Sequence, residues 1–357
     1  MSSKRRGIFA AGNFIVDHVK IIDSFPEQDT LVHILSECHS NGGGPYNILK
    51  DLAAMQVGYP LHACGMVGDD ADGRWIIRDC SAHGIDVGQL RISSCQPTSY
   101  TDAMTVRDSG RRTFFHQRGA NDLFAVDEQE IRASKACIFY LGYLMLLAGL
   151  DTFDDSGRSG ASRLLEAASS AGMITAVDLV SVDHSSYREL VLASLHYTDH
   201  LLLNELEASK VLDASLSADS PEQMMSAAMA ILKLGVRCTV TIHSSRGAVC
   251  ASSNGETATQ AALRLPPDFI AGATGAGDAF AAGFLHGIHE NLAIGRCLHI
   301  ATCTAAASLG DPSPSAGLRP VDECVELAER FGFVPFGSEN SVRQSLQGLI
   351  SGSQRTA

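Results

Sequence analysis

Short apolar runs alternate with segments of helical periodicity along most of this chain, and this alternation limits the possible folds more than any other feature. The runs that favour β-strands occupy residues 7–16, 60–68, 135–142, 173–180, 200–205 and 238–244. Apolar residues recur at helical spacing in residues 44–56, 72–84, 161–172 and 221–235. Such alternation is typical of a parallel sheet flanked by helices, so we predict an α/β fold.

Two stretches break this alternation and predict a second, smaller sheet. Residues 17–43 and 98–121 alternate in the manner of antiparallel strands, and the second stretch contains the hairpin turn RDSGRR. We interpret both as insertions on the α/β body. The lid segments that they would form lie at about 17–41 and 97–120.

The composition fits one large α/β domain. The chain has 357 residues, of which 45% are hydrophobic and 19% charged. We expect a single domain over residues 1–335 and a peripheral C-terminal tail over residues 336–357, which are mostly polar. The formal net charge of -13 argues against nucleic acid as a partner, because phosphate binding needs a basic face.

The cellular setting follows from the apolar segments and the cysteines. No segment reaches the roughly 18 consecutive apolar residues of a membrane-spanning helix. The ten cysteines contain no CxxC pair, and a disulfide framework would be unusual in a chain of this size. We therefore expect reduced thiols in a cytoplasmic protein that does not bind membranes.

The sequence AGATGAGDAFAAGF places one carboxylate, Asp278, after a small-residue turn and before an apolar helix. Gly275, Ala276 and Gly277 have almost no side chain, so their N–H groups at the helix start can surround a phosphate group. A carboxylate beside an anion site repels the anion, which favours a base that takes a proton from an attacking hydroxyl. The alternative is a helix N-cap, because aspartate is common at helix starts.

A second glycine cluster, NGGGPYN at 41–47, opens a predicted helix. Its glycines allow a ligand to approach the backbone closely, and the helix start offers free N–H groups. Asn47 adds one donor and one acceptor. A tight turn before a capped helix is the alternative interpretation.

Three polar residues follow apolar strands at positions where open parallel sheets bind ligands. Asn204 and Glu207, just past the run HLLLNE, are suited to hold water around Mg²⁺, or they form a strand-to-helix cap. Asp17, soon after the first strand, is either solvated or accepts hydrogen bonds from two sugar hydroxyls.

The stretch VTIHSSRGAVC predicts a strand, a polar turn and a further strand. Thr241, Ser245 and Gly247 lie there as candidate nucleotide contacts, and an ordinary hairpin is the alternative. The chain has no GxxxxGK[ST] loop, and no GxGxxG follows the first strand. A dinucleotide-dependent oxidoreductase is therefore not favoured.

Taken together and in this order, these motifs resemble those of the ribokinase-like (PfkB) carbohydrate kinase family, from about residue 7 to about residue 330. The resemblance implies a Rossmann-like three-layer α/β/α body with a β-sheet lid over the sugar. It also implies transfer of the ATP γ-phosphoryl group to a sugar hydroxyl, with ATP and Mg²⁺ required.

The resemblance also implies roles for individual residues. Asp278 matches the catalytic base, and the anion hole is formed by Gly275, Ala276 and Gly277. The substrate contacts are expected at Asp17, Gly43, Asn47 and, from the lid sequence, Arg118 and Asn121. The positions that match nucleotide and magnesium contacts are Asn204, Glu207, Thr241, Ser245, Gly247, Gly275 and Gly277, with Glu207 acting on Mg²⁺ through water.

The chain departs from the family pattern at two places. The family pattern DTxGAGD begins with aspartate and threonine. In this chain Gly272 and Ala273 stand at those two positions. Because Gly272 has no carboxylate, activation by potassium is doubtful. In the nucleotide turn, Ser244 stands where a glycine is common, which weakens the placement of ATP contacts there.

Several functions remain open at this stage. A neutral sugar such as ribose or fructose is the first choice of substrate. A nucleoside such as adenosine or inosine is the second, since Tyr100, Phe114 and Phe115 are available to stack on a base. A sugar acid, for which Arg118 is the nearest partner, is the third. A non-catalytic sugar- or nucleotide-binding regulator on the same fold is the alternative from another class.

The lid sequence also suggests how two chains would associate. A homodimer through the lid is expected, because apolar residues on its outer face would otherwise meet water. The residues that supply this face are Val32, Ile34, Met104 and Val106.

Overall fold

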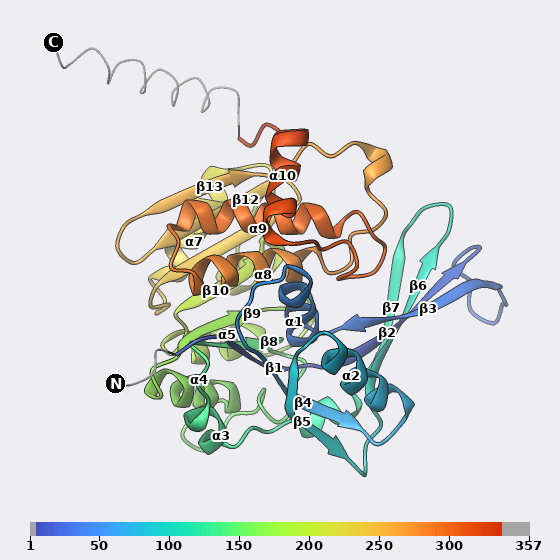
Figure 1. Cartoon of the computed structure of the whole chain (residues 1–357), viewed down its shortest axis with the longest axis horizontal. Coiled ribbons are helices and arrows are strands. Elements are labelled where there is room, and N and C mark those ends of the chain that lie inside the picture. The colour runs from blue at the N-terminus through green and yellow to red at the C-terminus, as the bar shows by residue number, and fades with distance from the viewer. Residues whose placement is uncertain (1–4, 338–357) are drawn as a thin grey trace.

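The structure, a computed structural model that describes residues 5–337, is built on a sheet of nine strands (Figure 1). In spatial order the strands are β13 (Thr257–Ala261), β12 (Gly247–Ser252), β11 (Thr239–Ser244), β10 (His200–Asn204), β9 (Ile174–Asp178), β8 (Ile138–Gly142), β1 (Ile8–Gly12), β4 (Leu61–Gly68) and β5 (Asp86–Ser93). Pairing is parallel from β11 to β5, and β12 and β13 add antiparallel pairs at one edge. The carboxyl ends of the parallel strands therefore share one edge.

Helices cover both faces of this sheet, which confirms the three-layer α/β/α body. Helices α1 (Gly44–Ala54), α2 (Ala71–Ala82), α8 (Ala276–His289), α9 (Ile294–Ser308) and α10 (Val321–Phe331) pack on one face. The other face is covered by α3 (Glu128–Ala133), α4 (Gly160–Ser170), α5 (Tyr187–Leu195), α6 (Glu205–Leu212) and α7 (Pro221–Leu232). Alternate residues of β1 enter the two cores, because strand side chains point to opposite faces: Ile8 and Ala10 join one, Phe9 and Ala11 the other.

A second, small sheet is present and projects from the body (Figure 1). Its order is β3 (Ile34–Gly42), β2 (Ile15–Ile22), β6 (Ser99–Val106) and β7 (Arg112–Gln117). The strands arise from the two stretches that the sequence marked as insertions. The strand predicted at 7–16 is in fact divided: β1 ends at Gly12, and the chain leaves the large sheet before β2 begins at Ile15.

Single 3₁₀ turns at Gly119–Leu123 and Pro267–Phe269 complete the elements between residues 5 and 337. Over that range no helix combines the length and the apolar character needed to cross a bilayer. The predicted tail at 336–357 lies outside the described residues except for Phe336 and Gly337.

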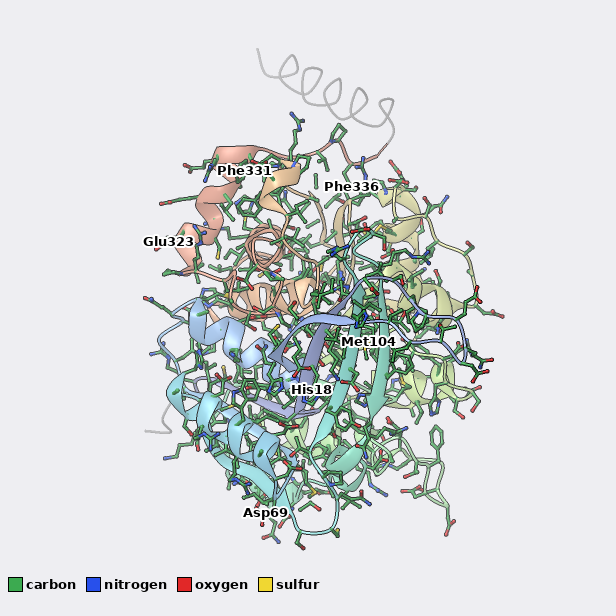
Figure 2. All side chains as sticks on the ribbon, turned by 90° about the vertical axis from the view of Figure 1, so that its right-hand side faces the viewer. His18, Asp69, Met104, Glu323, Phe331 and Phe336 are labelled. Carbon is green, nitrogen blue, oxygen red and sulfur yellow. The ribbon has the colours of Figure 1, made fainter. Side chains whose placement is uncertain are left out.

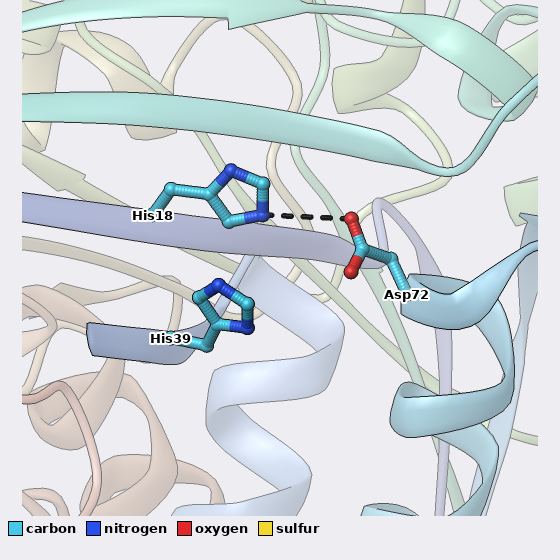
Figure 3. A group of neighbouring side chains, drawn as sticks. All are labelled: His18, His39 and Asp72. Atoms are coloured by element: carbon cyan, nitrogen blue, oxygen red, sulfur yellow. Dashed lines mark ion pairs between the residues drawn. The ribbon is translucent and has the colours of Figure 1, made fainter. Parts of the chain in front are cut away.

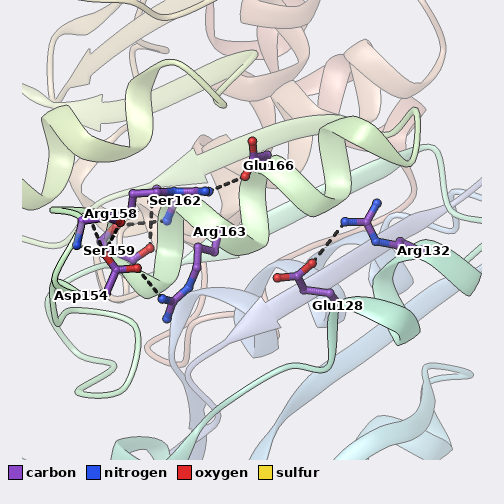
Figure 4. A network of polar contacts seen from close by, with 9 residues as sticks. Glu128, Arg132, Asp154, Arg158, Ser159, Ser162, Arg163 and Glu166 are labelled. Carbon is purple, nitrogen blue, oxygen red and sulfur yellow. Dashed lines mark hydrogen bonds and ion pairs between the residues drawn. The ribbon is translucent and has the colours of Figure 1, made fainter.

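Polar contacts fix the start of α4, on the helical layer opposite α8 (Figure 4). The Ser159 hydroxyl accepts a hydrogen bond from the Ser162 backbone N–H at 3.1 Å, which caps the helix. Nearby, the Arg163 guanidinium lies 2.7 Å from the Asp154 carboxylate. Such partly exposed ion pairs contribute little to stability, so the cap and the core below it hold this helix.

Helices α8 and α9 pack backbone against backbone because small residues line their contact. A Cβ atom added at Gly283 of α8 would lie 2.3 Å from the Thr304 Oγ1 atom and 2.8 Å from the Ala301 Cα atom of α9. Thr304 also donates a hydrogen bond from its hydroxyl to the Ala279 carbonyl at 2.8 Å. This contact fixes the position of α8 in the body.

We expect Gly283→Ala to lower the free energy of unfolding by about 1–3 kcal/mol, because α8 and α9 would have to separate. The measurement is the Tm of the purified protein. Gly295→Ala is the matched control, since a Cβ there meets nothing within 4 Å. Equal Tm values for the two variants would contradict this account of the packing.

Candidate active site

A cavity of about 230 Å³ lies at the carboxyl ends of the central strands. Three buried carboxylates line it: Asp178 at the end of β9, Glu207 in α6 and Asp278 in the first turn of α8. The turn at 273–277 forms another wall. A polar hollow at this edge of a parallel sheet is the expected place for a ligand.

Asp278 is only 6% exposed, and donors from two other parts of the chain hold its carboxylate. The Tyr143 hydroxyl donates to Oδ1 at 2.5 Å, and the Asn47 side-chain amide donates to Oδ2 at 2.8 Å. Burial raises the pKa of Asp278 to about 6, and the two hydrogen bonds oppose that rise. The carboxyl group therefore titrates close to neutral pH.

The start of α8 has the backbone conformation of an anion site. Gly275 is the N-cap with φ 77°, and a Cβ there would lie 2.5 Å from the Pro314 Cβ atom, so glycine is required. Backbone N–H groups in the first turn of a helix have no partner within the helix. A Cβ at Gly277 would meet nothing closer than 3.5 Å, at His243. A side chain at Gly277 would therefore contact the His243 ring.

Asn47 is oriented by a chain of hydrogen bonds that begins in the small sheet. The Asn41 side-chain amide donates to Asn47 Oδ1 at 2.7 Å and to Ser315 Oγ at 2.9 Å. The Asn47 nitrogen is thereby directed at Asp278. Gly43, the N-cap of α1 with φ 89°, leaves no room for a side chain, because a Cβ would lie 2.4 Å from the Asn13 carbonyl oxygen.

Asp17 lies in β2 of the small sheet, and not in a loop directly after the first strand as its position in the sequence suggested. Burial is the main cause that raises the pKa of Asp17 to about 7, and the charge of Asp278 adds to the rise. A Cβ at Gly42 would lie 2.5 Å from Asp17 Oδ1, so this glycine gives the carboxylate its space. The small sheet therefore brings a second carboxylate toward Asp278.

Asn204 and Glu207 form a capping box at the start of α6. The Asn204 backbone N–H donates to Glu207 Oε2 at 2.8 Å, while the Ser181 hydroxyl donates to Oε1 at 2.9 Å. Burial raises the pKa of Glu207 to about 7. Because both carboxylate oxygens already accept hydrogen bonds, Glu207 is better placed to bind a cation through a bridging water than directly.

Asp178 belongs to the site and was not singled out from the sequence. Burial is the main cause that raises its pKa well above the usual range, and the charges of Glu207 and Asp278 add to the rise. The signal for Asp178 was present, since it ends the strand ITAVD at the edge where Asn204 was recognised.

Two further residues at the cavity were also not singled out. Tyr143 directly follows β8, and its backbone N–H donates to the Asn13 side chain, which fixes it beside Asp278. His243, near the end of β11, lines the cavity, and burial lowers its pKa to about 4. A neutral imidazole therefore faces the turn before α8.

The remaining candidates lie elsewhere in the described part of the chain, outside the lining of this cavity. Thr241 is buried within β11, Ser245 forms the turn to β12, and Gly247 begins that strand. The Arg118 guanidinium is 2.6 Å from an Asp122 carboxylate oxygen. These four assignments stay predictions.

Asn121 is completely buried. Its side-chain amide donates to the Phe14 carbonyl and accepts from the Phe14 N–H, each at 3.3 Å. It therefore joins the start of β2 to the 3₁₀ turn at Gly119–Leu123, and its role toward a substrate stays a prediction.

The tip of the small sheet reaches the turn before α8. The Arg112 guanidinium of β7 donates a hydrogen bond to the Thr274 hydroxyl. A positive charge from the small sheet is thus placed beside the turn that precedes α8. No local sequence pattern indicates this contact, because 162 residues separate its partners.

Comparison with known proteins places this geometry in a family. The model of the pfkB family carbohydrate kinases matches residues 6–320. A fructokinase of Klebsiella pneumoniae is 28% identical over 270 residues, which are 71% of this chain and 80% of that protein. A 5-dehydro-2-deoxygluconokinase of Clostridium perfringens is 22% identical over 305 residues, 81% of this chain and 84% of that protein.

Solved structures share the fold. The ribokinase of Arabidopsis thaliana in complex with ribose and ATP has a TM-score of 0.74 and 21% identity, covering 90% of this chain and 98% of its own. The nucleoside kinase of Methanocaldococcus jannaschii has a TM-score of 0.69 and 19% identity, covering 92% of this chain and 99% of its own.

The buried carboxylates predict how stability depends on pH. The pKa values of Asp17, Glu207 and Asp278 are raised in the folded protein, so the folded state holds more protons than the unfolded state between about pH 4 and about pH 7. Stability therefore falls as pH rises through this range. We expect Glu207→Gln to weaken the pH dependence of Tm, because one such group is removed while the capping box is kept.

Glu205→Gln is the control, since Glu205 lies in the same helical turn but is less buried. The Tm is measured without ligand between about pH 5 and about pH 8 for the three proteins. An unchanged pH dependence in Glu207→Gln would show that Glu207 is not protonated on folding.

Proposed function

The chain belongs to the pfkB family of carbohydrate kinases, and from this premise we propose that it transfers the γ-phosphoryl group of ATP to a hydroxyl of a small neutral sugar of the ribose or fructose type. The observation that carries the proposal is the buried Asp278 carboxylate, with its pKa raised to about 6, in the first turn of α8. A protein that only bound these ligands would not need a base beside an anion site, which argues against a non-catalytic regulator.

In the proposed reaction, Asp278 accepts the proton of the sugar hydroxyl while that oxygen attacks the γ-phosphorus. The hydrogen bonds from Asn47 and Tyr143 hold the carboxylate in one orientation, which lowers the entropic cost of reaching the reactive geometry. The backbone N–H groups around Gly275 and Gly277 receive the negative charge that develops on the phosphoryl oxygens.

Asp178 and Glu207 fit a magnesium ion, because Mg²⁺ prefers carboxylate oxygens and keeps several waters. Burial is the main cause that raises both pKa values, and the charges of neighbouring carboxylates add to the rise, which a bound cation would relieve. When bound, Mg²⁺ neutralises part of the charge of the ATP phosphates. We propose Glu207 as a contact through water, while Asn204, Thr241, Ser245 and Gly247 remain proposed contacts of the nucleotide and its phosphates.

The side chains of the small sheet favour a neutral sugar over a nucleoside. Tyr100 packs against His18 on the face turned away from Asp17, because Asp17 and His18 are neighbours on one strand. Phe115 is paired with Asp102, which is paired with His18, so it also lies on that face. Of the three aromatic residues considered, Phe114 alone, which is paired with Ala103, lies on the Asp17 face, and it is the one ring left to stack on a base.

Charge on the small sheet argues against a sugar acid. The guanidinium of Arg118 is already paired with Asp122. The groups that face a sugar, Asp17 and Asn47, are suited to hydroxyls. We propose that the small sheet acts as a lid, which the contact of Arg112 with Thr274 supports, and that it excludes water during transfer.

Two further features support proposals about the protein's state in the cell. Of the four residues predicted for the outer face, Ile34 is exposed, whereas Val32, Met104 and Val106 are half-buried. Together with the exposed Leu35, Phe114 and Phe115, Ile34 supports the proposal of a homodimer through that sheet. Analytical ultracentrifugation measures this directly. All ten cysteines are free thiols, which supports a cytoplasmic location.

The experiment that tests the proposed function measures ATP turnover with a panel of pentoses, hexoses, sugar acids and nucleosides. We expect the highest kcat/KM with a neutral sugar. Turnover only with nucleosides would contradict the substrate class, and tight binding of a sugar without any turnover would favour the regulator.

The panel is run in potassium and in choline salts. We expect equal rates, because Gly272 supplies no carboxylate and a Cβ there would lie 2.7 Å from the Pro312 Cα atom. A strong requirement for potassium would show that another group binds the ion.

We expect Asp278→Asn to bind the sugar as the wild type does but to lower kcat about 100- to 10,000-fold, because the base is lost. Asp268→Asn, at an exposed position before α8, is the control. In the wild type, kcat/KM should rise as pH passes about 6, where Asp278 ionises. Tyr143→Phe should move this rise to higher pH, because the Tyr143 hydroxyl lowers the pKa of Asp278. A kcat near that of the wild type in Asp278→Asn would overturn the assignment.

A further inference from the structure

We propose that His18, His39 and Asp72 bind a divalent transition-metal ion, with zinc as the best match, on the face of the small sheet turned away from Asp17. His18 lies on β2, His39 lies directly opposite on β3, and Asp72 lies in the first turn of α2. Figure 2 shows His18 on the small sheet, and Figure 3 shows the stacked rings of His18 and His39 with the Asp72 carboxylate beside them. The proposal does not rest on the proposed kinase activity.

The three side chains lie close enough together to share one ion, and one pair has the separation of two metal ligands. One ligand atom from each residue lies within 4.8 Å of the other two. His18 Nε2 is 3.4 Å from Asp72 Oδ2, yet this nitrogen is buried and makes no hydrogen bond. With metal–ligand bonds of about 2.0–2.1 Å, tetrahedral ligand atoms are about 3.3–3.4 Å apart. The separation is therefore long for a hydrogen bond but fits two ligands of one ion.

The other side of the His18 ring has the partner that metal-binding histidines usually have. His18 Nδ1 is 3.6 Å from Asp102 Oδ1, and Asp102 is also paired with Lys20. A carboxylate on this side of the ring favours the tautomer that carries its proton on Nδ1 and leaves Nε2 free. The Tyr100 ring stacks on the imidazole at 5.3 Å and restrains its orientation.

The ligand types indicate which ion fits. Two imidazoles and one carboxylate suit zinc and its neighbours, while magnesium and calcium prefer oxygen ligands alone. The side chains of His18 and Asp72 are 21% and 29% exposed, so an ion can enter from solvent. Three protein ligands leave a fourth position for water.

The position of the His18–His39–Asp72 cluster means that a bound ion would link the small sheet to the α/β body. Two ligands belong to the small sheet and the third to a helix of the α/β body, so a bound ion would connect the two parts. Asp17 directly precedes His18 and points to the opposite face. Binding should therefore restrain the strand that carries a carboxylate of the candidate active site.

The experiment titrates the untagged, fully reduced chain with Zn²⁺ by calorimetry and measures Tm with and without the ion. We expect one equivalent that raises Tm and is lost or weakened at least about tenfold in His18→Gln, His39→Gln and Asp72→Asn. Asp102→Asn should weaken it about 10- to 100-fold through the orientation of His18. His39 is exposed, so His39→Gln should keep its fold, which its Tm without zinc checks.

His62→Gln is the matched control, because His62 pairs with Asp86 at 2.9 Å outside the His18–His39–Asp72 cluster. It should bind zinc as the wild type does. Unchanged affinity in His18→Gln and His39→Gln would overturn the proposal.

Co²⁺ absorption distinguishes the ligands. A cobalt spectrum without a thiolate charge-transfer band supports the imidazole site. A thiolate band that persists in His18→Gln would place the ion on a cysteine such as the exposed Cys38, and would also overturn the proposal.

Discussion

The hydrogen bond from Asn47 to Asp278 joins parts of the chain that are 231 residues apart, and the candidate active site depends on it. A buried carboxylate is costly unless donors surround it, and among residues 5–337 the side-chain donors to Asp278 come from α1 and from the residue after β8. The body must therefore bring α1, β8 and α8 to one edge before this carboxylate can be buried. The parallel order of the sheet does so, because it places the ends of its strands side by side.

Much of the fold was predictable because its signals are local. The alternation of strands and helices predicted the three-layer body, and the two antiparallel stretches predicted the small sheet. The division of residues 7–16 into β1 and β2 was not predicted, because both halves are apolar and the change of sheet depends on tertiary contacts around Asn13 and Phe14.

The candidate site was predictable only where glycine or a polar motif marks it. Asp278, Asn47 and Glu207 stand next to such signals. Asp178 ends an apolar strand and Tyr143 follows one, with no motif around either. The importance of Asp178 follows from strand order, and that of Tyr143 from the donor that Asp278 needs. The contact of Arg112 with Thr274 depends on how the small sheet sits over the body, which no local pattern encodes.

Because α8 packs closely on α9, one part of the candidate site is held rigidly in the α/β body, while the other part belongs to the small sheet. The turn at 273–277 and Asp278 are anchored in the body, since Gly283 leaves these helices no space to shift. Asp17 instead moves with β2. Two contacts of the small sheet reach this anchored part, Arg112 with Thr274 and Asn41 with Asn47. Elsewhere in the small sheet, changes can alter the groups around Asp17 without moving that turn, so under the proposed function a lineage of such proteins can exchange acceptors while it keeps one chemistry.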